Sequence, residues 1–134
     1  MFNLQDRVAL ITGSTRGIGL ALARGLAQSG ATVILDVADP EAVDAAFEAF
    51  DREGLAIDIL VNNAGIQHRQ PMLEVSLEDW NRVLHTNLTA AFMVGRAAAR
   101  RMIARGAGGK IINIGSLTSE AARATVAPYT VAKG

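Results

Sequence analysis

The chain has 134 residues, of which 50% are hydrophobic and only 4% aromatic, a composition that fits one domain with an aliphatic core. Thirteen basic residues balance thirteen acidic ones, which argues against a nucleic acid or an anionic membrane as partner. The absence of cysteine and the presence of only two histidines exclude disulfides and thiolate metal sites, and we expect no metal cluster.

The first predicted elements are a strand and a helix. Residues 1–7 lack the apolar core of a signal peptide, and no segment has the roughly 20 apolar residues that span a bilayer, so we expect a soluble, cytoplasmic protein. Residues 7–12 form a short apolar run before glycines, which predicts a buried strand. Residues 17–29 predict a helix, because Ile18, Leu22 and Leu26 recur at helical spacing and Gly30 follows.

Strands and helices continue to alternate along the chain. Residues 31–35 read as a second strand, and Asp39-Pro40-Glu41 supplies an N-cap, a first-turn proline and an early carboxylate for a helix. Its expected apolar side chains are Val43, Ala46, Phe47 and Phe50. A third strand at 57–61 then ends in Asn62-Asn63-Ala64-Gly65.

A long helix is predicted after Ser76, whose hydroxyl can cap it with Asp79 in the first turn. One of its faces carries Leu88, Phe92, Gly95, Ala99 and Met102, and we interpret Arg96, Arg100, Arg101 and Arg105 as a solvated face rather than an anion site. A fourth strand at 110–115 and a helix near Tyr129 complete the pattern. The sequence therefore predicts one α/β domain over residues 1–134, with three αβα layers, about four parallel strands and right-handed crossovers.

The loop after the first strand predicts a dinucleotide site. Its residues Gly13, Ser14, Arg16, Gly17, Ile18 and Gly19 allow a tight turn, and the following helix N-terminus favours a pyrophosphate. Purely structural glycines are the alternative. Arg16 favours NADP, because it can reach a 2′-phosphate. Asp36, at the end of the second strand, favours NAD, because a carboxylate there accepts from the ribose 2′-hydroxyl.

Four later residues have side chains suited to acid–base chemistry. Tyr129 and Lys133 are four apart, so a helix brings them to one face, where the ammonium can lower the phenol pKa. Such a pair also occurs often by chance. Ser116 follows the fourth strand, at the sheet edge where open α/β folds bind ligands. Asn87 is unfavourable inside a helix, which indicates a role there, although a surface asparagine is the alternative.

The chain resembles the short-chain dehydrogenase/reductase family, which has a Rossmann-type fold. The resemblance rests on five features in the family's order: T-G-x-x-x-G-x-G, N-N-A-G, Asn87, Ser116 and Y-x-x-x-K. The resemblance implies hydride transfer between a nicotinamide cofactor, NADP or alternatively NAD, and an alcohol or ketone. It implies that Tyr129 is the acid/base, that Lys133 lowers its pKa and binds the nicotinamide ribose, that Ser116 orients the carbonyl, and that Asn87 supports a proton relay. For the segment Asn62-Asn63-Ala64-Gly65, the resemblance implies that the side chains tie the central strands together and that the backbone passes the cofactor, with Asn63, Ala64 and Gly65 as the cofactor-binding residues. We expect a small-molecule substrate and a possible homo-oligomer.

Finer resemblances concern the substrate and the length. Residues 65–69, 110–114 and 126–129, together with Ser119-Glu120 and Arg123, resemble family members that interconvert gluconate and 5-ketogluconate. Arg69, Glu120 and Arg123 are then candidates to meet a sugar acid, or another polyol or ketone, with exposed loop charges as the alternative. Compared with the family pattern, one βα unit of about 30 residues is missing between Gly19 and Asn62. The resemblance then implies that Asp36 lies near the adenine ring and does not select NAD over NADP. The chain stops one residue after Lys133. We therefore expect weak cofactor binding and little turnover. The alternative function is a catalytically silent Rossmann fragment that binds a nucleotide or another protein.

Overall fold

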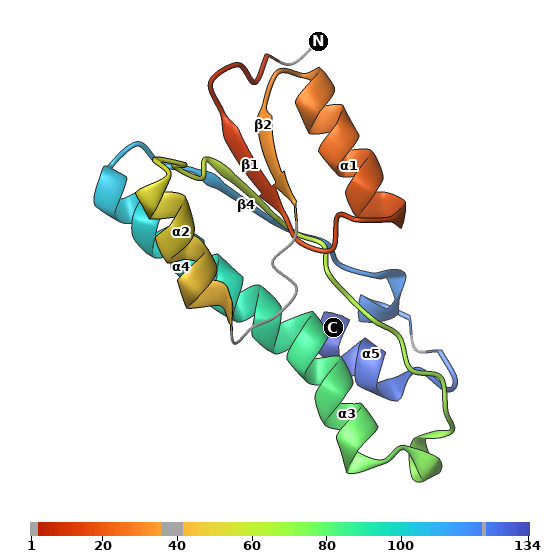
Figure 1. Cartoon of the computed structure of the whole chain (residues 1–134). Helices are drawn as coiled ribbons and strands as arrows, with labels where there is room; N and C mark the ends of the chain where they lie inside the picture. Colours follow the sequence, from red (N-terminus) through yellow and green to blue (C-terminus); the bar gives the residue numbers. More distant parts are fainter. Residues whose placement is uncertain (1–2, 36–41, 122) are drawn as a thin grey trace.

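The computed structural model describes residues 3–35, 42–121 and 123–134, and within them a four-stranded parallel sheet forms the centre of the molecule (Figure 1). Its strands are β1 (Val8–Ile11), β2 (Thr32–Leu35), β3 (Ile59–Asn62) and β4 (Lys110–Asn113). They lie in the order β2-β1-β3-β4, and all three neighbouring pairs are parallel. The predicted fold class is thus confirmed.

Helices cover both faces of this sheet. They are α1 (Gly17–Gln28), α2 (Val43–Arg52), α3 (Leu77–Leu84), α4 (Ala90–Arg105) and α5 (Ala127–Lys133), with 3₁₀ turns η2 (Met72–Glu74) and η4 (Leu117–Ser119) and the π-helix η3 (His85–Thr89). Figure 1 shows α1 on one side of the sheet and α2 with α4 on the other. The helices α3 and α5 lie together beyond the carboxyl ends of the strands. No helix of the described ranges is long and apolar enough to cross a membrane.

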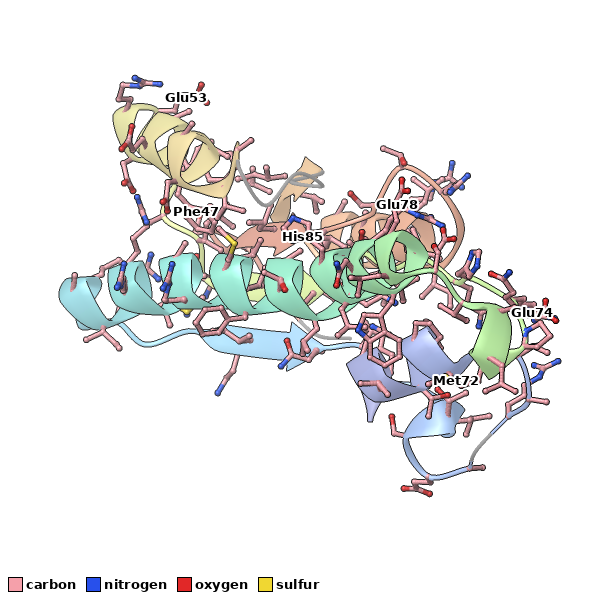
Figure 2. The ribbon with its side chains drawn as sticks, turned by 90° about the horizontal axis from the view of Figure 1, so that it is seen from below. Phe47, Glu53, Met72, Glu74, Glu78 and His85 are labelled. Carbon is pink, nitrogen blue, oxygen red and sulfur yellow. The ribbon has the colours of Figure 1, made fainter. Side chains whose placement is uncertain are left out.

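The central strands β1 and β3 read as continuous apolar runs because both of their faces are covered. The edge strand β4 is exposed along its whole length. Leu10 and Leu60, both fully buried, belong to the core shared with α2 and α4, where Phe47 packs between the two helices (Figure 2). Their neighbours Ile11 and Val61 belong to the second core, under α1. The period of two along each strand therefore sends alternate side chains into two different cores.

Local signals at helix ends agree with the structure where it describes them. The Ser76 side chain accepts from the Asp79 N–H at 3.0 Å and caps α3, and Gly30 ends the turn after α1 with φ +98°. Ile18, predicted on the apolar face of α1, is instead 69% exposed. Asp36 and the predicted capping segment Asp39-Pro40-Glu41 lie outside the described residues.

The apolar face predicted for the long helix is wrong in part. The side chains that α4 buries are Ala90, Val94, Ala97, Ala98 and Met102, whereas Leu88 and Phe92 are 48% and 61% exposed. Small side chains let a helix approach a sheet closely, so the alanine-rich side of α4 packs inward.

Two of the four arginines predicted to be solvated are in fact ion-paired. Arg101 contacts Asp51 of α2 at 2.7 Å and lies 5.0 Å from the ring centre of Phe47. Its hydrogen bonds are the main reason that the pKa of Asp51 is lowered. Arg105 contacts Asp58 at 3.0 Å. Both pairs join segments about 50 residues apart, so helical spacing alone gives no sign of them.

Candidate active site

The glycine loop lies against the segment that follows β3, as parallel strands require at their shared carboxyl edge. The backbone N–H groups of Asn63 and Ala64 both donate to Thr12 Oγ1 at 3.0 Å. The Asn63 side-chain amide donates to the carbonyl oxygens of Thr12 and Gly13 at 3.0 and 3.1 Å. A Cβ on Gly19 would stand 2.4 Å from Gly13 O. Asn63 therefore ties the two central strands together, as predicted, and the contact requires glycine at position 19.

The N-terminus of α1 has the properties that a pyrophosphate needs. Arg16 occupies the N-cap position without a side-chain cap, and no acidic residue lies in the first turn. A Cβ on Gly17, at φ +56°, would meet nothing within 4 Å, so the space beside the turn is open. Within the described residues the fully buried Ser14 hydroxyl has no hydrogen-bond partner. Unpaired N–H groups, positive helix-end charge and an unpartnered hydroxyl fit an anionic cofactor group.

The other asparagine of this segment ties β3 to β4. Asn62 donates through Nδ2 to Asn113 Oδ1 at 2.8 Å and to the carbonyl oxygen of Ala91 in α4 at 3.2 Å. Asn62 and Asn113 are register partners at the ends of these strands. The predicted role of this segment in joining central strands is therefore confirmed for both asparagines.

Asn87 lies in the π-helix η3, where the helix departs from regular α geometry. Its side chain is 4% exposed. Oδ1 accepts from the Ile66 N–H at 2.7 Å, and Nδ2 donates to the Ile66 carbonyl oxygen at 2.8 Å. The residue that is unfavourable inside a regular helix thus lies where the long helix becomes π-helical, and π-helical turns are frequent at functional sites. The side chain holds the loop after β3 against the long helix.

The helix α5 presents Tyr129 and Lys133 one turn apart. Lys133 Nζ donates to the carbonyl oxygen of Ile114, just past β4, at 2.7 Å, and burial lowers the pKa of this ammonium group. Tyr129 is partly buried. Pro128 is fully buried, which anchors this short helix through packing rather than length.

A cavity of about 320 Å³ connects several of these groups. Its lining includes Asn62, Asn87 and Asn113, the aromatic ring of Phe92 and the ammonium-bearing Lys133. The structure thus brings two of the four predicted acid–base residues to one cavity. Neither Tyr129 nor Ser116 belongs to the lining, but their elements α5 and η4 pack together beside it.

Ser116 is the N-cap residue of the turn η4, three residues after the last residue of β4. Its Oγ accepts from the Thr118 N–H at 3.2 Å and from Thr118 Oγ1–H at 3.0 Å. Because both lone pairs of the oxygen are used, its own O–H is left to donate. This geometry suits a group that donates a hydrogen bond to a substrate oxygen.

Sequence reasoning missed three parts of this site. They are the groups that hold predicted residues in place: Thr12 holds Ala64, Asn113 holds Asn62, and the carbonyl oxygen of Ile114 holds Lys133. These contacts join residues 19 to 52 positions apart. Position at a strand end is the one signal that could have indicated them.

The residues predicted to meet the substrate, Arg69, Glu120 and Arg123, are exposed. Arg69 Nε donates to Gln67 Oε1 at 3.4 Å. In the described ranges no three His, Asp or Glu side chains are grouped as a metal site.

Comparison with known proteins places this site in a family. The family model of short chain dehydrogenases matches residues 34–134. The chain is 45% identical to gluconate 5-dehydrogenase of Gluconobacter oxydans (strain 621H), and the alignment covers 100% of this chain and 62% of that protein. It is 38% identical to 5-keto-D-gluconate 5-reductase of Escherichia coli (strain K12), covering 100% and 63%.

A solved structure agrees with these matches. The crystal structure of a gluconate 5-dehydrogenase from Burkholderia cenocepacia J2315, in complex with NADP and tartrate, superposes with a TM-score of 0.90 at 46% identity. The match covers 99% of this chain and 62% of that one.

The chain is also internally shorter than its relatives. The Gluconobacter alignment is 161 positions long and includes all 134 residues of this chain, so the relative has 27 residues opposite gaps, the difference of the two lengths. That number fits the prediction of one missing βα unit. The chain spans 62% to 63% of the length of the curated relatives it matches here.

Proposed function

Because this chain belongs to the short-chain dehydrogenase family, we propose that it is an NAD(P)-dependent oxidoreductase that interconverts an alcohol and a ketone, with gluconate and 5-ketogluconate as substrates and NADP as cofactor. The observation that carries the proposal is α5, which places Tyr129 and Lys133 one turn apart and anchors Lys133 on Ile114, two residues before Ser116. The printed names of the relatives supply the substrate pair. NADP is supported by Arg16, whose exposed side chain is suited to bind a 2′-phosphate.

The chain's own residues then have distinct tasks. The residues proposed to hold the cofactor are Gly13, Ser14, Arg16, Gly17, Ile18, Gly19, Asn63, Ala64, Gly65, Tyr129 and Lys133, with Asp36 as a further candidate. The bound nicotinamide supplies the hydride acceptor or donor. The Ser116 O–H donates to the substrate oxygen. The Tyr129 phenol exchanges the proton at that oxygen, and the Lys133 ammonium favours the phenolate. Asn87 holds the adjoining loop and is the proposed support of the proton relay.

The test is NADPH oxidation with 5-ketogluconate by the 134-residue chain beside its Tyr129→Phe variant. Loss of a general acid typically costs about 10²- to 10⁴-fold in rate, so we expect slow turnover by the parent and a further decrease of that size in the variant. NADPH binding, followed by fluorescence, serves as the folding control. Equal turnover by both would refute the role of Tyr129. NADPH binding without turnover by either would favour the alternative function, a nucleotide-binding fragment.

A further inference from the structure

The loop between β3 and η2 is fastened to a different element at each of three points. Its first part is held by Thr12, after β1. Ile66 is held by the Asn87 side chain through both of its backbone groups. The third point is Gln70, whose N–H donates to the carbonyl oxygen of Thr125 at 2.8 Å. Thr125 lies four residues before Tyr129, at the entry to α5.

Thr125 needs such a contact because its backbone is in an unfavourable region. Its φ is +67°, a left-handed conformation that costs a non-glycine residue free energy and persists only where neighbouring groups enforce it. The next residue, Val126, is 1% exposed and leads directly into α5. The direction in which α5 leaves this turn therefore depends on what holds Thr125.

The side chain of Gln70 is itself held by His68. His68 Nε2 lies 2.8 Å from Gln70 Oε1, and Arg82 Nη2 lies 3.4 Å from His68 Nδ1. Since an amide oxygen only accepts, His68 Nε2–H is the donor in the contact with Gln70. Asp79 Oδ2 is 3.7 Å from the same Nε2.

Asp79 and Arg82 give the ring a fixed support on α3. Arg82 contacts Asp79 Oδ1 at 2.6 Å, and the Ser76 hydroxyl donates to Asp79 Oδ2 at 2.8 Å. These hydrogen bonds, from Arg82 first and Ser76 second, lower the pKa of Asp79, with a further contribution from His68. The Asp79 carboxylate and the Arg82 guanidinium are thus paired, and the His68 ring lies between this pair and the Gln70 side chain.

We infer that His68 is a positioning residue: it links the Asp79–Arg82 pair of α3 to Gln70, and through the Gln70–Thr125 hydrogen bond it sets the entry to α5 and the place of Tyr129. The inference rests on the proposed function for the role of Tyr129. The contacts themselves predict a local effect on α5 that can be measured without cofactor or turnover.

The experiment is hydrogen–deuterium exchange of the complete chain, which compares the segment 126–134 with β1 as an internal reference. In His68→Leu, which cannot donate to Gln70, exchange in 126–134 accelerates about three- to tenfold, the factor expected from one lost hydrogen bond of ordinary strength. In His68→Gln the side-chain amide can donate as Nε2–H does, so exchange returns toward the parent rate. The matched control is His85→Leu at the other histidine, which is exposed and labelled in Figure 2, and it leaves the segment unchanged.

Three outcomes of the exchange experiment overturn the inference: unchanged exchange of 126–134 in His68→Leu, equal acceleration of β1, or a His68→Gln variant that exchanges as fast as His68→Leu. Failure of the proposed hydride transfer does not affect this readout. If the chain turns over, His68→Leu lowers kcat by a larger factor than it raises the KM for NADPH, because α5 with Tyr129 moves while the glycine loop does not. An unchanged kcat would also overturn the inference.

Discussion

Two glycines of the same helix should respond to alanine in opposite directions. A Cβ on Gly19 would stand 2.4 Å from Gly13 O, 2.5 Å from Asn63 Nδ2 and 2.9 Å from Ser14 Cα. Gly13 O and Ser14 Cα belong to the backbone, and the Asn63 amide is fixed by its two hydrogen bonds to the glycine loop. A Cβ on Gly25, later in α1, would meet nothing within 4 Å.

The magnitudes follow from these distances. Replacing glycine by alanine inside a helix stabilises it by about 0.8–1.0 kcal/mol, and Gly25→Ala should gain this amount in full. At Gly19 that gain is outweighed by a steric cost of about 1–3 kcal/mol or more, the usual range for overpacking, and no flexible atom can move away. For a domain of this size 1 kcal/mol corresponds to about 3–5 °C in Tm. The two variants should therefore differ visibly in thermal unfolding.

The assay is thermal unfolding by circular dichroism, combined with NADPH titration by fluorescence. We expect Gly25→Ala to melt a few degrees above the parent and to bind NADPH equally well. Gly19→Ala should melt below it and bind NADPH at least about tenfold more weakly, which corresponds to about 1.4 kcal/mol, because the glycine loop must shift. A Gly19→Ala variant with the same melting temperature as Gly25→Ala would refute the packing described for the glycine loop.

Two further predictions concern side chains of the site. Asn87→Leu leaves the buried N–H and carbonyl groups of Ile66 without their partner and should lower the free energy of unfolding by about 2–4 kcal/mol, measured by urea denaturation, whereas Asn81→Leu, exposed on α3, should change it by less than about 0.5 kcal/mol. Burial lowers the pKa of Lys133 in the folded state. Between that lowered pKa and the ordinary lysine pKa of about 10.4, the unfolded chain therefore binds more protons than the folded chain. In this range the contribution of Lys133 to the free energy of unfolding rises with pH. Lys133→Met should remove this rise, and an unchanged slope across that alkaline range would contradict it.

Much of the fold follows from local patterns. The four apolar runs became parallel strands and the helical repeats became α1 and α2, because periods of two and 3.6 residues decide which side chains an element can bury. Ser76 capped its helix as predicted, since a cap depends only on residues three positions apart. The order of the glycine loop, N-N-A-G, Asn87, Ser116 and Y-x-x-x-K indicated the family before any contact was visible. The family comparison confirms that part of the interpretation.

The sequence by itself thus determined the element types, their order and the family to which the chain belongs. The tertiary structure alone decided which face of α4 is buried, that Arg101 and Arg105 are paired, that Lys133 is held by Ile114 and that His68 reaches α3 and Gln70 together. The physical reason is sequence separation. Periodicity and capping act within one or two turns of a helix or strand. Partners such as Arg101 and Asp51, 50 positions apart, meet only because the crossovers bring α2, α4 and the strand ends to common faces of one sheet.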